Sequence, residues 1–170
     1  MYNTLINKII CFVTVVIMQV IVFDNIRFGN YIHPCVYVFL IMIMPFDTSQ
    51  LRLLINGFII GMTIDIFSGT PGLNAAATVF MAFVRPYIIA LTTKKSDVED
   101  KNRPTVTEMG LKWFVVYGLL LLILHNLVLF WLEAFSVRLL GIVLLETLLS
   151  AVVSLLVILL IIYLLKPIKK

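Results

Sequence analysis

One acidic residue lies within a strongly apolar stretch of the sequence, among regularly spaced glycines. Gly57, Gly61 and Asp65 follow one another at intervals of four residues, and Gly69 and Gly72 come after them. Residues four apart share one face of a helix, so the two absent side chains would let a second helix approach and cover the carboxylate. A carboxylate at membrane depth is costly unless it is shielded. We therefore predict that these five residues form a helix-packing surface or a partner interface.

Further polar side chains interrupt other apolar segments and are candidates for intramembrane sites. They are Asn56, Asn74, Arg85, His125, Asn126, Glu146, Ser150 and Ser154. Asp65, His125 and Glu146 are expected at similar depth, where they could face one outward cavity and relay protons or hold a polar ligand. The alternative is that each makes an interhelical hydrogen bond that fixes packing. The spacing of Ser150 and Ser154 from Glu146 indicates a packing face on one helix.

Arg85 is expected near the opposite membrane face from Asp65, so we predict no salt bridge between them. It should lie level with Asn56 and within reach of Asp47, or else extend its side chain to the headgroups. No Gly-x-Ser-x-Gly, Walker, His-Glu-x-x-His or Cys-x-x-Cys motif is present. We therefore expect no enzymatic activity, no catalytic residue, no metal site and no cofactor.

The composition indicates a multi-pass membrane protein. The chain has 170 residues, of which 62% are hydrophobic and 13% charged, and its mean hydropathy is +1.11. A soluble domain of this size needs a more highly charged surface. The net charge of +4 comes from cations grouped in loops and at the C-terminus, which is typical of orientation signals rather than of nucleic-acid binding.

The apolar runs predict an all-α membrane protein with six transmembrane helices in a single domain covering residues 1–170. A span needs about 20 mostly apolar residues. The expected spans are 5–23, 32–46, 51–67, 72–91, 113–132 and 139–165. The second is short and contains Pro34 and Pro45, and the third and fourth are joined by a tight turn at Ser68–Gly72.

The distribution of cations predicts that both termini are cytoplasmic. With the N-terminus inside, ten Lys and Arg residues fall on the inner side and only Arg27 and Arg138 on the outer side, with Arg85 within a span. The polar segment 92–112 then forms an inner loop. It is either a solvated connection or a docking site for a cytoplasmic partner or anionic lipid headgroups.

The stretch from Asn56 to Asn74 resembles the third-span signature of MreD, a family of small integral membrane proteins of the bacterial rod-shape system. MreD proteins typically show Gly-x-x-x-Asp, an aliphatic or aromatic pair, a small-residue turn and a further glycine. Gly61, Asp65, Gly69 and Gly72 match this pattern. Outside this stretch the likeness is one of length and hydropathy.

This resemblance implies a non-catalytic scaffold in the bacterial inner (cytoplasmic) membrane. Its partner would be an MreC-like single-span protein, and indirectly MreB, the RodA glycosyltransferase and a penicillin-binding transpeptidase of lateral peptidoglycan synthesis. The implied fold is similar to the substrate-binding component of energy-coupling-factor vitamin transporters, so that role is the alternative. The alternative requires convergent polar groups in an outer pocket, and the sequence offers few: Asp65, Asn74, His125 and Glu146.

Overall fold

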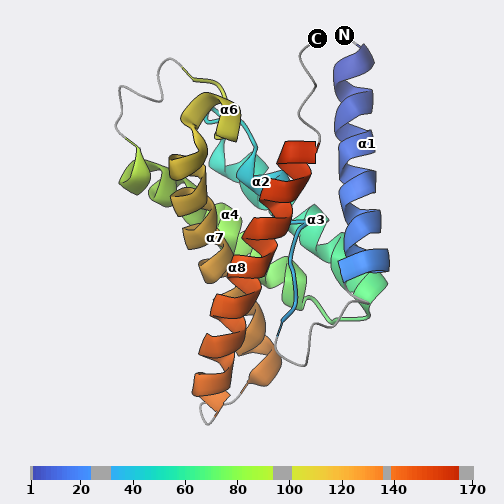
Figure 1. The fold of residues 1–170 in the computed structure, drawn as a ribbon. Helices are drawn as coiled ribbons and strands as arrows, with labels where there is room; N and C mark the ends of the chain where they lie inside the picture. The colour runs from blue at the N-terminus through green and yellow to red at the C-terminus, as the bar shows by residue number, and fades with distance from the viewer. Residues whose placement is uncertain (1, 24–31, 94–100, 136–138, 165–170) are drawn as a thin grey trace.

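Four long apolar helices dominate the computed structural model, which describes residues 2–23, 32–93, 101–135 and 139–164 (Figure 1). They are α3 (Gln50–Ser68), α4 (Leu73–Thr92), α7 (Leu111–Ala134) and α8 (Leu140–Leu164). Each is long and apolar enough to cross a membrane. They confirm the helices predicted at 51–67, 72–91, 113–132 and 139–165. The chain is thus an all-α protein with the features of a multi-pass membrane protein.

The N-terminal helix joins a short π-helical segment. Helix α1 (Tyr2–Met18) continues into the π-helix η1 (Gln19–Phe23), so the segment predicted as 5–23 is helical throughout. Its apolar part runs from Ile9 to Phe23. The change of helical pitch occurs at Gln19, a buried polar residue. Single π-helical turns often occur where a side chain has a specific task.

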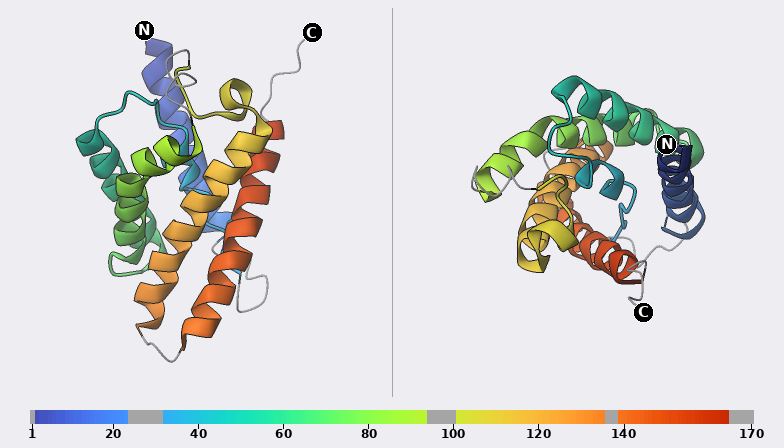
Figure 2. Two further views of the ribbon diagram at one scale, coloured as in Figure 1. Left: turned by 90° about the vertical axis from the view of Figure 1, so that its left-hand side faces the viewer. Right: turned by 90° about the horizontal axis from the view of Figure 1, so that it is seen from above.

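The prediction of a helix over 32–46 is wrong, because this segment does not form a spanning helix. Residues 32–36 carry no regular structure, and the following helix α2 (Phe39–Met42) is a single turn. This segment is nevertheless the centre of the molecule. Figure 2, seen from above, shows the long helices arranged around α2. Its residues 35–38, 41 and 42 are all buried, so part of the protein core lies on backbone outside the long helices.

Side chains from distant helices satisfy the polar backbone of this central segment. Gln19 donates from Nε2 to the Pro34 carbonyl at 2.9 Å and accepts at Oε1 from the Val36 amide at 2.8 Å. Ser150 and Ser154 on α8 accept from the backbone amides of residues 33 and 35. Non-helical backbone at membrane depth is tolerated only when protein or a water-filled cavity covers it. These side chains provide that cover.

The long helices pack in sequence order, α3 against α4, α4 against α7 and α7 against α8. The start of α1, the α2–α3 connection, α6 (Val106–Met109) and the end of α8 lie at one end of the molecule, and the α3–α4 turn lies toward the other (Figure 1). Helix α6 falls within the predicted loop 92–112, where the Thr105 hydroxyl accepts from the Glu108 amide as its N-cap. Residues 94–100 of that loop lie outside the described part of the chain.

Candidate functional site

The Asp65 carboxylate joins the end of α3 to the beginning of α4. Asp65 is 3% exposed. Its Oδ1 accepts from the backbone amide of Asn74 at 3.0 Å, from Asn74 Nδ2 at 3.1 Å and from the Thr70 hydroxyl, and its Oδ2 accepts from the Ala75 amide at 2.8 Å. Two of these donors are first-turn amides of α4, which have no partner within their own helix. A negative charge there also interacts favourably with the helix dipole.

The glycines of the motif make this geometry possible. A methyl group on Gly61 would lie 2.5 Å from Ala75 Cα and 2.6 Å from the Asn74 carbonyl oxygen. Helix α4 therefore begins directly against the bare backbone of α3. Gly69 and Gly72 have φ angles of 70° and 81° and form the turn between the two helices, a backbone conformation that favours glycine. The close helix approach that the sequence predicts is thus present, and it occurs within this one chain.

A chain of buried polar groups extends from Asp65 to α7. Asn74 Nδ2 faces Asp65 and Thr70, so its Oδ1 accepts the phenolic proton of Tyr37 at 2.7 Å. The Tyr37 oxygen lies 3.0 Å from His125 Nε2. Because Tyr37 has given its only proton to Asn74, its oxygen accepts a hydrogen bond from His125, which places a proton on Nε2. Four separate parts of the chain, α3, α4, α7 and the central segment, thus meet in one network.

The hydrogen bonds at the His125 end of this network determine how the Asn126 side-chain amide is oriented. His125 Nδ1 lies 3.1 Å from Asn126 Oδ1, while Asn126 Nδ2 has no hydrogen-bond partner among the described residues. A neutral imidazole protonated at Nε2 needs a donor at Nδ1. Exchanging the amide oxygen and nitrogen of Asn126 supplies that donor and gives Nδ2 its partner. In this arrangement His125 is uncharged and held at both nitrogens.

The expected cluster of Asp65, His125 and Glu146 around one cavity is only partly present. Asp65 and His125 are connected, but through Asn74 and Tyr37, and Glu146 takes no part in this network. A side-chain amide does not readily accept and release protons at neutral pH, so Asn74 is a poor link in a proton relay. The arrangement is better suited to fixing the positions of α3, α4, α7 and the central segment.

A cavity does lie on this side of the molecule, with other residues around it. Its volume is about 380 Å³, within the range of roughly 300–1,000 Å³ typical of small-molecule sites. Its polar lining residues are Gln19, His33, Tyr37, Ser68, Thr70, Asn74 and Glu133. Asn74 is the one residue of this lining that the sequence marked as a candidate. Asp65 and His125 lie behind it and do not line it, and neither does Glu146.

The serine face on α8 contacts backbone rather than another helix. Ser150 Oγ accepts from the His33 amide at 3.0 Å, and Ser154 Oγ accepts from the Cys35 amide at 2.8 Å. Ser154 also donates to the Ser150 carbonyl at 2.6 Å. Glu146, one turn earlier, is partly exposed and belongs to neither pair. The predicted packing face thus exists from Ser150 onward, and its partner is the extended segment 32–36.

Arg85 is buried in the opposite half of the molecule, where groups of the protein hold its guanidinium. It is 1% exposed. Its Nε donates to the Tyr117 hydroxyl at 3.0 Å, and its Nη2 donates to the Met44 carbonyl. Among the described residues, no hydrogen bond joins Arg85 to its expected neighbours: Asp47 is exposed, and Asn56 Nδ2 donates to a backbone carbonyl one turn earlier in α3. Arg85 and Tyr117 together hold the C-terminal end of α2, because Tyr117 also donates to the Met42 carbonyl at 3.0 Å.

Sequence reasoning missed three residues that the structure places at the centre of these networks. Gln19 carried a signal, since it is the only polar side chain between Val15 and Phe23. Tyr37 and Tyr117 did not, because a tyrosine in an apolar run also reads as a packing residue. In the described part of the chain, no three His, Cys, Asp or Glu side chains gather in a way that could hold a metal ion.

Comparisons with protein-family models, with curated proteins and with solved structures found no match to this chain.

Proposed function

We propose that this chain is a non-catalytic membrane scaffold of the bacterial elongation complex, as its resemblance to MreD implies. It would sit in the cytoplasmic membrane with both termini inside and pair with an MreC-like single-span protein. Through that pair it would connect cytoplasmic MreB with RodA, a penicillin-binding transpeptidase and lateral peptidoglycan synthesis. Six membrane passages would require segment 32–46 to traverse the membrane as buried, non-helical backbone.

The observation that carries this proposal is the way the Asp65 carboxylate holds the end of α3 to the beginning of α4. The residues that carry the resemblance have structural tasks in this chain: Gly61 allows helix contact, Asp65 binds the start of α4, and Gly69 and Gly72 form the turn. The carboxylate accepts from four donors of its own chain. A carboxylate so occupied serves to hold a rigid hairpin, which is what a scaffold must present to its partners.

The test is to isolate the tagged protein from its native membranes in mild detergent and to identify co-purifying proteins by mass spectrometry. Recovery of an MreC-like protein with wall-synthesis enzymes is the expected result. Asp65→Leu should reduce this recovery and disturb cell shape, whereas Glu146→Leu should leave both intact, with the tag reporting protein levels. Normal cell shape and full recovery in the Asp65→Leu strain would contradict the proposal.

The second candidate is the substrate-binding component of an energy-coupling-factor transporter, and the outer cavity favours it. The sequence offered few polar groups for such a pocket, but folding brings His33, Tyr37, Thr70, Asn74 and Glu133 to one cavity of about 380 Å³. In the same isolation experiment, this candidate predicts paired ATPases with a second transmembrane subunit. It also predicts a small polar ligand that is lost when Asn74 or Tyr37 is replaced.

A further inference from the structure

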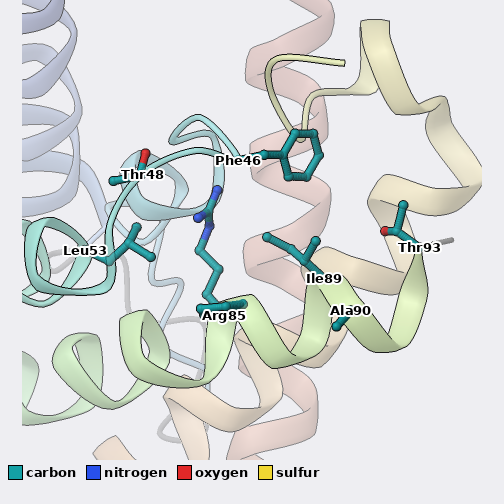
Figure 3. Close-up of a pocket in the computed structure, with 8 residues that line it drawn as sticks. Phe46, Thr48, Leu53, Arg85, Ile89, Ala90 and Thr93 are labelled. Carbon is teal, nitrogen blue, oxygen red and sulfur yellow. The ribbon is translucent and has the colours of Figure 1, made fainter. Parts of the chain in front are cut away.

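A second cavity, lined in part by Arg85, lies at the other end of the bundle from the α3–α4 turn. Its volume is about 460 Å³. Its lining residues come from the α2–α3 connection, the first turn of α3 and the C-terminal half of α4: Phe46, Thr48, Leu53, Arg85, Pro86, Ile89, Ala90 and Thr93. Figure 3 shows the Arg85 side chain extending from α4 toward the connection that carries Phe46 and Thr48. The cavity is thus apolar along α4 and cationic at one end.

Arg85 carries a charge that the described residues do not neutralise. An arginine keeps its proton in proteins, so it cannot avoid the cost of burying a charge by becoming neutral. Both of its hydrogen-bond acceptors, the Tyr117 hydroxyl and the Met44 carbonyl, are uncharged groups. Within residues 2–23, 32–93, 101–135 and 139–164, no carboxylate forms an ion pair with it, and the nearby Asp47 faces solvent. Buried charges are normally paired, so Arg85 is suited to binding an anion.

The unused hydrogen-bonding capacity at the cavity fits a phosphate. The guanidinium has five N–H donors, and the two bonds described above leave most of them for a ligand. The planar guanidinium can donate two parallel N–H bonds to phosphate oxygens, which makes arginine well suited to binding phosphate.

We infer that this cavity binds the phosphate headgroup of an acidic phospholipid, with Arg85 as its anchoring cation. The position of Arg85 favours a lipid over a soluble anion. Its Cα lies seven residues before the end of α4, about 10 Å along the helix axis at roughly 1.5 Å per residue, so it lies within the apolar span, and its side chain extends toward the α2–α3 connection. Phe46, Leu53, Ile89 and Ala90 supply the apolar wall for the glycerol and the upper acyl chain. This inference does not depend on the proposed scaffold role.

The test measures lipid binding to the full-length protein in detergent micelles by native mass spectrometry. The probes are dioctanoyl phosphatidic acid, dioctanoyl phosphatidylcholine and inorganic phosphate. Arg85→Gln should weaken phosphatidic acid binding at least tenfold, which is the effect of losing about one charge-assisted hydrogen bond. Ala90→Phe should weaken it similarly by filling the cavity while leaving the charge in place. Arg52→Gln removes an exposed cation next to Leu53, at the end of α3 that lines the cavity. This variant should change the affinity less than twofold.

Each outcome decides the matter. Preferential binding of phosphatidic acid that is lost in Arg85→Gln and Ala90→Phe but kept in Arg52→Gln supports the inference. Equal binding of phosphatidylcholine, or equal losses in all three variants, would overturn it. Inorganic phosphate that binds as tightly as phosphatidic acid would overturn the lipid as the source of the anion. Because Ala90 lies on the exposed side of α4, the Ala90→Phe variant keeps the test valid if Arg85→Gln does not fold.

Discussion

Replacing Gly61 with alanine adds one methyl group at the closest contact between α3 and α4. The new Cβ would lie 2.5 Å from Ala75 Cα, 2.6 Å from the Asn74 carbonyl oxygen and 2.7 Å from the Ala75 amide nitrogen. Nonbonded carbon atoms prefer about 3.5–4.0 Å, so the helices must separate by about 1 Å. All three contacts are with backbone, which cannot move aside as a flexible side chain would.

The size of the effect follows from this displacement. Overpacking by itself costs about 1–3 kcal/mol. The same movement stretches the hydrogen bonds from the Asn74 and Ala75 amides to Asp65, and charge-assisted bonds contribute about 1.5–3 kcal/mol each. Alanine regains about 1 kcal/mol over glycine in a helix. We therefore expect Gly61→Ala to lower the free energy of unfolding by about 3 kcal/mol.

The assay is unfolding by SDS in mixed micelles, followed by circular dichroism, with two matched glycine variants. A methyl group on Gly57 would lie 3.1 Å from both Ala82 Cβ and the Thr78 carbonyl oxygen, and one on Gly141 would meet nothing within 4 Å. Gly57→Ala should therefore cost at most about 1 kcal/mol, and Gly141→Ala should be neutral or slightly stabilising. If Gly61→Ala unfolds at the wild-type SDS concentration, or if Gly57→Ala is the more damaging variant, this account of the helix contact is wrong.

Three further substitutions test the polar networks in the same unfolding assay. Asp65→Leu removes the acceptor of four donors and should cost about 3 kcal/mol, while Glu146→Gln should change stability by less than about 0.5 kcal/mol. Tyr37→Phe removes two buried hydrogen bonds and should cost about 1–2 kcal/mol without loss of helix content. Ser154→Ala leaves the Cys35 amide without its acceptor, so it should cost about 1–2 kcal/mol and speed the reaction of Cys35 with a thiol reagent in a single-cysteine background.

These predictions also have outcomes that would contradict the assigned contacts. Equal losses of stability in Asp65→Leu and Glu146→Gln would mean that Asp65 has no special role in the hairpin. An unchanged thiol reaction rate in Ser154→Ala would mean that the serine does not hold the extended segment. If Tyr37→Phe is as stable as the wild type, the Tyr37 hydroxyl does not connect Asn74 with His125.

The long helices were predictable because they depend on local properties of the chain. An apolar run of about 20 residues favours a helix in a membrane whatever its neighbours are. The boundaries of α3 and α4 follow from the glycine-rich turn between them. The spacing of Gly57, Gly61 and Asp65 likewise fixes which residues share a face, because the helical repeat is constant. For the same reason Arg85 was correctly separated from Asp65.

The central segment was not predictable from hydropathy. Residues 32–46 are as apolar as a short span, and an apolar run does not reveal whether its backbone is helical. Its conformation depends on hydrogen bonds with the side chains of Gln19, Tyr117, Ser150 and Ser154. These residues are distant in sequence, so no local pattern connects them with the segment that they hold.

The sequence by itself determined the membrane character of this protein, its four long helices and the helix face that carries Asp65, since each follows from composition or from a fixed helical period. The tertiary structure alone decided what the polar residues contact. It turned Asp65 toward the start of α4, connected Asn74 to His125 through Tyr37, left Glu146 outside that network and buried Arg85 beside a cavity. The physical reason is that buried polar groups must find partners, and packing, rather than sequence spacing, decides which partners lie within reach.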